Sequence, residues 1–396
     1  MMLNQLKSWN MLKWSIAFLT AVCCLASACE SSKTTTATTT SSTAISRSPK
    51  LNSDQRPTNI ILMIGDGMGL TQITAGLYSN GNKLNLERFP IVGLHKSYSS
   101  DNLVTDSAAG ATAFSTGQKT YNGAIGVDND SMSLYTILEE AEANGLPTGM
   151  VSTSTIVHAT PASFIAHQAQ RSYYEAIAAD FLKTDIDLFI GGGKKYFDRR
   201  EDDRDLLAEL KAKGYQVSNY FEQPLDRVNI NYQTNFAYLT SDSDPLTVEQ
   251  GRSYLKPASI MACDFLDKRA KDNGFFLMIE GAQIDWGGHA NNSQYIITEM
   301  IDFDNTIGAV LDFAARDGNT LVIVTADHET GGYAINPGST HDSIIGAFTS
   351  DYHTAALIPV FAYGPGSQLF SGIYENTEIY YKMRDAFGFG DKTAEQ

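Results

Sequence analysis

The sequence predicts an α/β fold: a three-layer αβα sandwich around a mainly parallel central sheet. Three observations point to this class. Continuous apolar runs recur along the chain, helical patterns lie between them, and polar residues follow several of the runs directly. A continuous apolar run is typical of a strand buried on both faces. Strands that alternate with helices indicate a mainly parallel sheet covered by helices on both sides.

Six apolar runs are the expected strands. The first is NIILMIG, residues 59–65, and it opens the folded part of the chain near Pro57. The other expected strands lie at residues 149–153, 187–192, 275–281, 320–326 and 359–364. Each run is short and rich in aliphatic or aromatic residues, as expected for the interior of a parallel sheet.

Two helices are expected from periodicity and end signals. The segment SLYTILEEAEANG, residues 133–145, ends in Gly145, which is a typical helix stop. Residues 293–316 carry apolar side chains at helical spacing, and Gly318 follows. Residues 194–256 are more polar and irregular. We expect this region to be an elaboration at the periphery of the sheet.

Length and charge limit the classes of protein. The chain has 396 residues and is 43% hydrophobic, enough for one large α/β domain or two smaller ones. The formal net charge of −16 argues against a nucleic-acid-binding module, which normally shows a basic face. An anionic small molecule remains a possible substrate, because metal ions can invert the local electric field.

The N-terminal segment is expected to be a targeting signal. Lys7 and Lys13 precede the apolar run WSIAFLTAVCCLASAC, so residues 1–28 read as a signal peptide. The run is shorter than the about 20 apolar residues that a transmembrane helix needs. Cys29 is then the expected lipidation site of a bacterial lipoprotein. Cleavage after Ala26-Ser27-Ala28 without lipidation, or a plain apolar leader, would leave the same pattern.

These features predict an exported bacterial protein, periplasmic or anchored to the membrane through lipid. Residues 29–56 contain a Ser/Thr-rich stretch and are expected to be a flexible tether. A single domain is expected over residues 57–396. Cys263 is the one cysteine of the four beyond the leader region, so this domain is expected to have no internal disulfide. The stability of the folded domain must then come from its hydrophobic core, from bound metals or from a partner subunit.

Polar residues gather just after the predicted strands, where open α/β sheets bind their ligands. Asp285 and His289 are four residues apart, which places them on one face of a helix. A carboxylate and an imidazole suit zinc, although a solvated turn would show the same spacing. His353 is a lone histidine, more often structural when taken singly. The remaining polar residues at these strand ends are Asp66, Glu280, Asp327, His328 and Glu329.

The combination of motifs resembles the alkaline phosphatase family. The motifs IGDGMG, VTDSAAGATAFSTG, HATPASFIAH, EGAQIDWGGHANN, TADHETGG and HTA occur in the order of that family. The resemblance covers about residues 57–390 and is closest to the compact bacterial members. It implies an alkaline-phosphatase-like fold, hydrolysis of phosphate monoesters and a homodimer. Only residues 333–352 stand where many relatives carry a larger crown insertion, so a reduced crown and an open site are expected.

The resemblance also implies a role for each motif residue. Two zinc ions and one magnesium ion per subunit are implied. The first zinc set is Asp285, His289 and His353; the second is Asp66, Asp327 and His328; the magnesium set is Asp66, Thr160 and Glu280. Arg171 matches the phosphate-binding arginine, and Ser107 matches the nucleophile that forms a phosphoserine. The zinc ions are implied to assist the nucleophile, the leaving group and the attacking water.

The run around Ser107 suits that role. Residues 104–117 are small and almost free of bulky side chains, so a phosphate can approach one hydroxyl and nearby backbone N–H groups. If Ser107 begins a helix, the helix dipole also favours an anion. A serine hydroxyl alone is a weak nucleophile and needs activation. Asp106 is expected to order the turn. Without the metal set, Ser107 would read as a simple helix cap.

Two positions depart from the best-known bacterial form of the family. His158 stands where that form has an aspartate near magnesium, and Trp286 where it has a lysine that reaches the phosphate. We expect His158 to contact the metal ligands rather than a metal ion, and Trp286 to lie beside the bound substrate. His95 and His167 are expected to be structural, and His341 and Glu329 are given no role.

Two other functions remain open from the residues. A phosphodiesterase or sulfatase on the same scaffold generally lacks the third metal set and often uses another nucleophile. A surface protein that binds metal or phosphate without turnover needs no nucleophile. Ser107, Arg171, Thr160 and Glu280 together favour the monoesterase.

Overall fold

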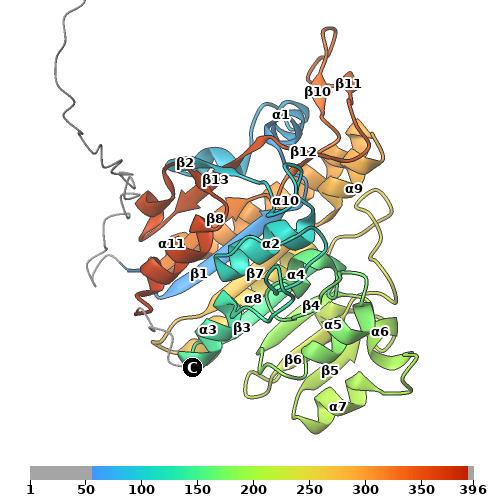
Figure 1. Ribbon diagram of the computed structural model, residues 1–396, viewed down its shortest axis with the longest axis vertical. Helices are drawn as coiled ribbons and strands as arrows, with labels where there is room; N and C mark the ends of the chain where they lie inside the picture. Colours follow the sequence, from blue (N-terminus) through green and yellow to red (C-terminus); the bar gives the residue numbers. More distant parts are fainter. Residues whose placement is uncertain (1–55, 391–396) are drawn as a thin grey trace, which may run out of the picture. The chain divides into compact units, whose positions relative to one another are not determined.

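The computed structural model describes residues 56–390. The predicted signal peptide, Cys29 and the tether up to residue 55 lie outside the described residues. Within them, a ten-stranded sheet has the order β14-β2-β13-β8-β1-β7-β3-β4-β6-β5. From β8 to β5 along this order, each strand is parallel to the next, whereas β13 runs antiparallel to both β8 and β2. The fold is therefore the predicted α/β sandwich around a mainly parallel sheet (Figure 1).

The elements of the described chain are as follows. The strands of the large sheet are β1 (Asn59–Gly65), β2 (Ile91–Lys96), β3 (Thr148–Thr155), β4 (Leu188–Gly192), β5 (Gln216–Asn219), β6 (Phe236–Leu239), β7 (Phe276–Gly281), β8 (Thr320–Thr325), β13 (Leu357–Tyr363) and β14 (Gly372–Glu375). Two small pairs are β9 (Glu329–Thr330) with β12 (His353–Thr354), and β10 (Ala334–Ile335) with β11 (Gly346–Ala347). The helices are α1 (Leu70–Ser79), α2 (Ser107–Thr116), α3 (Ile137–Ala143), α4 (Ala159–Ala162), α5 (Tyr174–Asp180), α6 (Lys195–Asp198), α7 (Leu206–Ala212), α8 (Leu255–Ala270), α9 (Gln283–His289), α10 (Ser293–Asp317) and α11 (Glu378–Phe387), with short 3-10 turns at Asn85–Arg88, Leu225–Arg227 and Ser367–Phe370.

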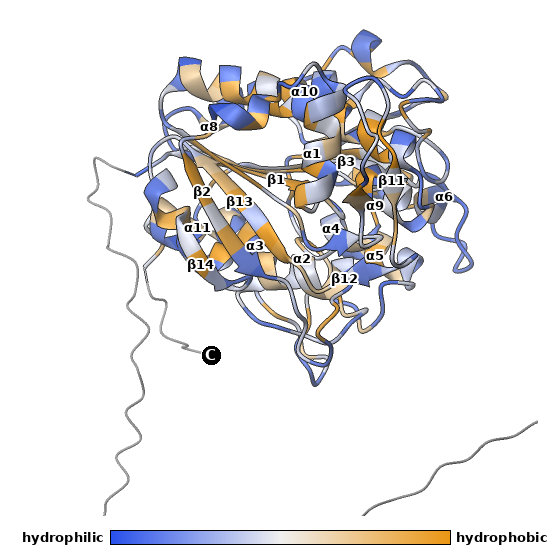
Figure 2. Ribbon diagram, turned by 90° about the horizontal axis from the view of Figure 1, so that it is seen from above, coloured by the Kyte–Doolittle hydropathy of each residue, from blue (hydrophilic) through white to orange (hydrophobic). Residues whose placement is uncertain are grey.

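Two hydrophobic cores lie on opposite faces of the sheet. Successive side chains of a strand point to opposite faces. Ile60 and Leu62 of β1 accordingly belong to the core under α2, α3 and α11, whereas Ile61 and Met63 belong to the core under α8 and α10. Figure 2 shows these two sets of helices on either side of the sheet. Burial on both faces explains why β1 reads as a continuous apolar run.

The six strands expected from apolar runs are present, and four further strands of the sheet were missed. The missed strands lie toward the two ends of the sheet order, and β2 and β14 are partly exposed. The region 194–256 does lie at the sheet's periphery, but it is more regular than expected. It adds β5 and β6 to the main sheet and includes α6 and α7. Strands of four residues are too short to give a clear periodic signal.

The two expected helices are also present. The helix at 293–316 is α10, which ends at Gly318 in the left-handed conformation. The helix expected from residue 133 begins only at Ile137, because Thr136 caps it by accepting from the amide of Glu139. No helix among residues 56–390 combines the length and the apolarity that crossing a membrane requires.

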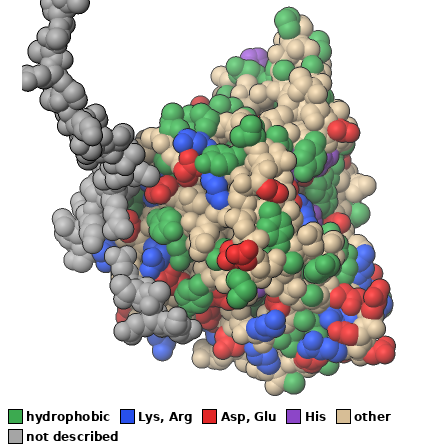
Figure 3. All heavy atoms as spheres, in the orientation of Figure 1, with side chains coloured by type: hydrophobic (Ala, Val, Ile, Leu, Met, Phe, Trp, Pro, Cys, Tyr) green, Lys and Arg blue, Asp and Glu red, His purple; other side chains and the backbone are tan. Residues whose placement is uncertain are grey.

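Charged side chains of both signs gather over α6 and α7, toward the lower right of Figure 3. The ion pairs there include Arg204 with Glu209, at 2.6 Å, and Arg200 with Asp202, at 2.5 Å. Interspersed charges of opposite sign cancel over a short distance.

His95 in β2 predicts a pH dependence of stability. Its ring is fully buried, its Nε2 lies 2.8 Å from the carbonyl of Ala326, and burial lowers its pKa to about 4. The unfolded chain takes up this proton near pH 6.5 but the folded chain does not. Stability is therefore lost as pH falls below about 6.5, by about 2 kcal/mol between pH 7.5 and pH 5.

Urea unfolding of the wild type and His95→Gln at the two pH values measures this contribution. Glutamine keeps a donor for the Ala326 carbonyl but does not titrate. The loss of stability at pH 5 should be smaller in the variant by that amount. Equal losses of stability in the two proteins would show that His95 does not cause the loss at pH 5.

Candidate active site

The candidate site lies at the carboxyl ends of the central strands. β8, β1 and β7 are adjacent and parallel, with Ile64 opposite Thr325 and Gly65 opposite Gly281. Asp66 directly follows β1, Glu280 lies near the end of β7, and Asp327 and His328 follow β8. Residues far apart in the chain therefore meet at one edge of the sheet, as the sequence predicted.

Helix α2 brings Ser107 to this edge. Ser107 is the first residue of the helix, and Asp106 before it caps the amide of Ala109 at 3.0 Å. A Cβ at Gly110 would lie 3.0 Å from the Cβ of Asp327, so the helix packs closely against the end of β8. Ser107 Oγ lies 3.3 Å from His328 Nε2. The small residues of this segment are thus required by close packing as well as by access.

Asp285, His289 and His353 form one cluster. Helix α9 places Asp285 Oδ2 3.3 Å from His289 Nε2, and β12 places His353 Nε2 3.2 Å from the same nitrogen. The Nδ1 atoms of both rings contact backbone carbonyls, those of Asp351 at 2.6 Å and Thr105 at 2.8 Å. These contacts leave the Nε2 atoms facing one another. Potential ligand atoms of the three residues lie within 4.8 Å of one another.

A second cluster joins Asp66, Asp327 and His328. His328 Nε2 lies 3.2 Å from Asp327 Oδ2 and 3.5 Å from Asp66 Oδ1. Asp285 also lies within ligand distance of Asp66 and His328, so its carboxylate borders both clusters. Asp66, Asp327 and His328 are fully buried, and burial lowers the pKa of His328 well below its ordinary value. The ring is therefore neutral, which is the form that binds metal.

The third cluster contains Asp66, His158 and Glu280, again within 4.8 Å. Thr160, expected beside them, is fully buried at the start of α4. His158 was expected to act behind the ligands, and the structure places a ring nitrogen of His158 among them. Burial and the charge of Arg171 lower the pKa of His158 to about 3, so this ring is also neutral.

Unpartnered oxygens test whether this space fits metal ions. In the described part of the chain, several buried oxygens have no hydrogen-bond partner: both carboxylate oxygens of Asp66, Glu280 Oε1, Asp327 Oδ2 and Thr160 Oγ1. Burial and neighbouring carboxylates raise the pKa of Asp327 and of Glu280 to about 7. Buried polar atoms normally find partners. Cations would supply the missing contacts and charge, so these residues fit bound metals.

Arg171 and Trp286 lie at the border of the site. Arg171 Nη1 lies 2.9 Å from Asp106 Oδ2, and its Nη2 lies 3.4 Å from His158 Nε2. The salt bridge ties the arginine to the residue before Ser107. Trp286 is half-buried on α9, with its ring centroid 6.1 Å from that of His158. Trp286 therefore packs edge-on against the ring of His158.

Other polar residues near the clusters were not assigned from the sequence. Ser152 and Ser154 in β3 both donate to Glu280 Oε2, at 2.5 and 3.2 Å. Thr330 in β9 donates to Asp285 and lies 3.2 Å from His328 Nδ1. Glu329 instead accepts from Gln72 and the amide of Tyr333. Ser152, in the predicted strand at 149–153, was visible as a polar residue in an apolar run.

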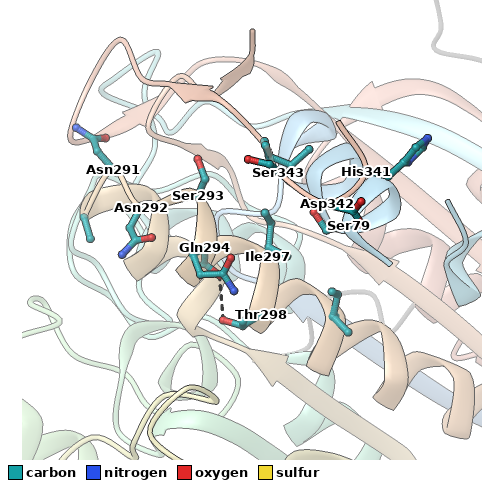
Figure 4. A pocket seen from close by; sticks show the side chains of 13 residues that line it. Ser79, Asn291, Asn292, Ser293, Gln294, Ile297, Thr298, His341, Asp342 and Ser343 are labelled. Carbon is teal, nitrogen blue, oxygen red and sulfur yellow. Dashed lines mark hydrogen bonds between the residues drawn. The ribbon is translucent and has the colours of Figure 1, made fainter. Parts of the chain in front are cut away.

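His341 lies elsewhere. It lines a cavity of about 780 Å³, between α1, the start of α10 and the segment that joins β10 to β11. Figure 4 shows His341 and Ser343 from that segment, Ser79 from the end of α1, and Asn292 and Thr298 beside them. None of the predicted metal or phosphate residues lines this cavity. His95 and His167 make backbone contacts, with Ala326 and Gly126.

Comparisons with known proteins agree on one family. The family model described as alkaline phosphatase matches residues 57–347. Alkaline phosphatase 3 of Bacillus subtilis is 39% identical over 334 residues, which cover 80% of this chain and 70% of that protein. The alkaline phosphatase of Escherichia coli K12 is 33% identical over 413 residues, which cover 85% and 87% of the two chains.

Solved structures extend the similarity to the fold. The alkaline phosphatase from the Antarctic bacterium TAB5 is 46% identical, with a TM-score of 0.78, and the match covers 85% of this chain and 99% of that one. A mutant of that enzyme was solved with Mg bound in its M3 site, and it matches with a TM-score of 0.78 at 45% identity.

Proposed function

The chain belongs to the alkaline phosphatase family and is an enzyme of that kind, and on this premise we propose that it hydrolyses phosphate monoesters through a phosphoserine on Ser107. The observation that carries the proposal is the position of Ser107 Oγ. It lies 3.3 Å from His328 Nε2, the nitrogen that also lies 3.2 Å from Asp327 Oδ2 and 3.5 Å from Asp66 Oδ1. A hydroxyl in that position is needed for covalent catalysis but not for binding alone.

The metals proposed are two zinc ions and one magnesium ion. Asp285, His289 and His353 would hold one zinc, and Asp66, Asp327 and His328 the other, since imidazole and carboxylate suit zinc. The oxygen set of Asp66, Thr160 and Glu280 would hold magnesium. When bound, these ions supply the positive charge that favours deprotonation of Ser107 and offsets the charge of the phosphate.

Individual residues of the chain would then have separate roles in the reaction. Ser107 Oγ attacks phosphorus, forming the P–O bond to serine as the bond to the leaving oxygen breaks. Water next attacks the phosphoserine, which releases inorganic phosphate and restores the serine. Arg171, which forms a salt bridge with Asp106, would bind two phosphate oxygens at once. The N-terminus of α2 adds a dipole that favours the anion.

Three further expectations rest on the sequence and the family resemblance. We propose a homodimer, a lipid anchor at Cys29, and export to the periplasm or its membrane surface. The support for the last two is the apolar N-terminal run, its flanking lysines and the cysteine that follows it. The physiological substrates would be organic phosphate monoesters outside the cytoplasm.

Steady-state hydrolysis of an aryl phosphate monoester and the matching diester tests the reaction class. We expect the wild type, loaded with zinc and magnesium at alkaline pH, to prefer the monoester strongly and to lose turnover in chelator. A preference for the diester would move the chain to the phosphodiesterase class. Absence of turnover by the fully loaded protein would favour a binding protein.

A further inference from the structure

Thr330 lies between the two candidate zinc clusters and touches both. It is fully buried in β9, two residues after His328. Its Oγ1 donates to Asp285 Oδ1 and lies 3.2 Å from His328 Nδ1. Asp285 belongs to the cluster with His289 and His353, and His328 to the cluster with Asp66 and Asp327. One hydroxyl therefore connects a residue of each cluster.

The hydrogens on Thr330 and His328 determine which group donates in each of these two hydrogen bonds. A threonine hydroxyl donates one hydrogen and can also accept. Thr330 Oγ1 donates its hydrogen to Asp285 Oδ1. That hydrogen is then in use, so the hydroxyl can only accept at its other contact. The contact with His328 Nδ1 must then use a hydrogen on that nitrogen.

This assignment sets the state of the other ring nitrogen. A neutral imidazole carries a single N–H, so His328 Nε2 keeps a free lone pair. Nε2 is the nitrogen that faces Ser107 Oγ, Asp327 Oδ2 and Asp66 Oδ1, at 3.3, 3.2 and 3.5 Å. The lone pair is therefore directed at the space where the second zinc would bind.

The surroundings hold Thr330 in this position. β9 pairs with β12, with Thr330 opposite His353, and Gln72 Nε2 donates to the Thr330 carbonyl at 2.8 Å. A Cβ at Gly288 would lie 2.8 Å from Thr330 Cβ, and one at Gly67 would lie 2.8 Å from Oγ1. Close packing on two sides leaves the side chain little room to rotate.

We propose that Thr330 is a positioning residue that fixes the Nδ1–H tautomer of His328 and the orientation of Asp285, and so makes the two zinc sites interdependent. The inference rests on the proposed zinc sites and adds a link between them. Outer partners of ligating histidines fix the tautomer and ring orientation, and their loss typically weakens metal binding about 10- to 100-fold.

Zinc affinity of the full chain tests the link without using activity. Zinc alone is titrated into chelator-stripped wild type, Thr330→Val and Thr330→Ser, in competition with a chromophoric chelator. Valine keeps the shape but not the hydroxyl, and serine keeps the hydroxyl. We expect Thr330→Val to bind zinc about 10- to 100-fold more weakly at both sites. Thr330→Ser should bind as the wild type does.

The outcomes separate this inference from the proposed function. Wild-type affinity in Thr330→Val, or weakening confined to one site, would overturn the link while leaving the zinc sites in place. A wild type that binds no zinc would overturn the metal part of the proposed function as well. Long-range proton–nitrogen NMR of metal-free wild type decides the matter even if the valine variant does not fold. The His328 signals should show Nδ1–H, and Nε2–H would refute the assignment.

Discussion

Replacement of Ser107 by alanine should lower kcat/KM for an aryl phosphate monoester by roughly 10³-fold or more. Ser107 Oγ lies 3.3 Å from His328 Nε2, in the cluster with Asp66 and Asp327. Alanine removes only that oxygen and suits a helix start packed this closely, so folding and zinc affinity should persist. Steady-state kinetics of the metal-loaded variant, with zinc content measured in parallel, gives the result.

A matched control lies in the same helix. Ser115 is also fully buried in α2, but its Oγ donates to the carbonyl of Ser163 at 2.6 Å. Ser115→Ala should cost about 1 kcal/mol of stability and leave kcat/KM near the wild-type value. If both variants lost activity equally, the effect would belong to the packing of α2, and Ser107 would not be identified as the nucleophile.

Removal of the metals should abolish turnover and lower the melting temperature. Asp66, Asp327 and Glu280 are fully buried, and each has an oxygen without a partner in the described residues. Without cations, these carboxylates repel one another and can only relieve the repulsion by taking up protons. Thermal unfolding and activity before and after chelation, and after return of zinc and magnesium, measure both effects.

A substitution separates metal loss from general damage. Asp327→Asn removes one charge from the site at nearly constant volume and should lower zinc affinity and activity together. Asp304→Asn is the control, because Asp304 is also buried but accepts from the amides of Asn85 and Leu86, at 2.8 and 3.1 Å. Asp304→Asn should lose stability without loss of zinc. A chelated wild type that keeps full activity would contradict the metal assignment.

Much of the fold could be predicted because buried positions carry apolar residues, and their pattern is visible in the sequence. Ile60 and Ile61 face different cores, so β1 is apolar at every position. β5 was missed because a strand of four residues gives no clear period. The start of α3 was placed too early, since Leu134 and Tyr135 fit the helical pattern while Thr136 acts as the cap.

The proximity of the candidate site residues was predictable where they lie in one local motif. Asp285 and His289 lie on one helix, and Asp327 and His328 are adjacent, so each pair is visible in one segment. Thr330 was not predictable, because its role depends on the distance from its hydroxyl to Asp285, 45 residues away in the chain. Nothing in the sequence shows which of the several threonines near these motifs makes such a contact.

The measurement that tests the central claim most directly is identification of the phosphorylated residue. The metal-loaded enzyme is mixed with a monoester or inorganic phosphate, quenched rapidly in acid, digested and analysed by mass spectrometry. The account predicts phosphate on the peptide that contains Ser107, at Ser107 itself, and none in Ser107→Ala. Phosphate on another residue, or rapid turnover of Ser107→Ala without any phosphorylated peptide, would contradict it.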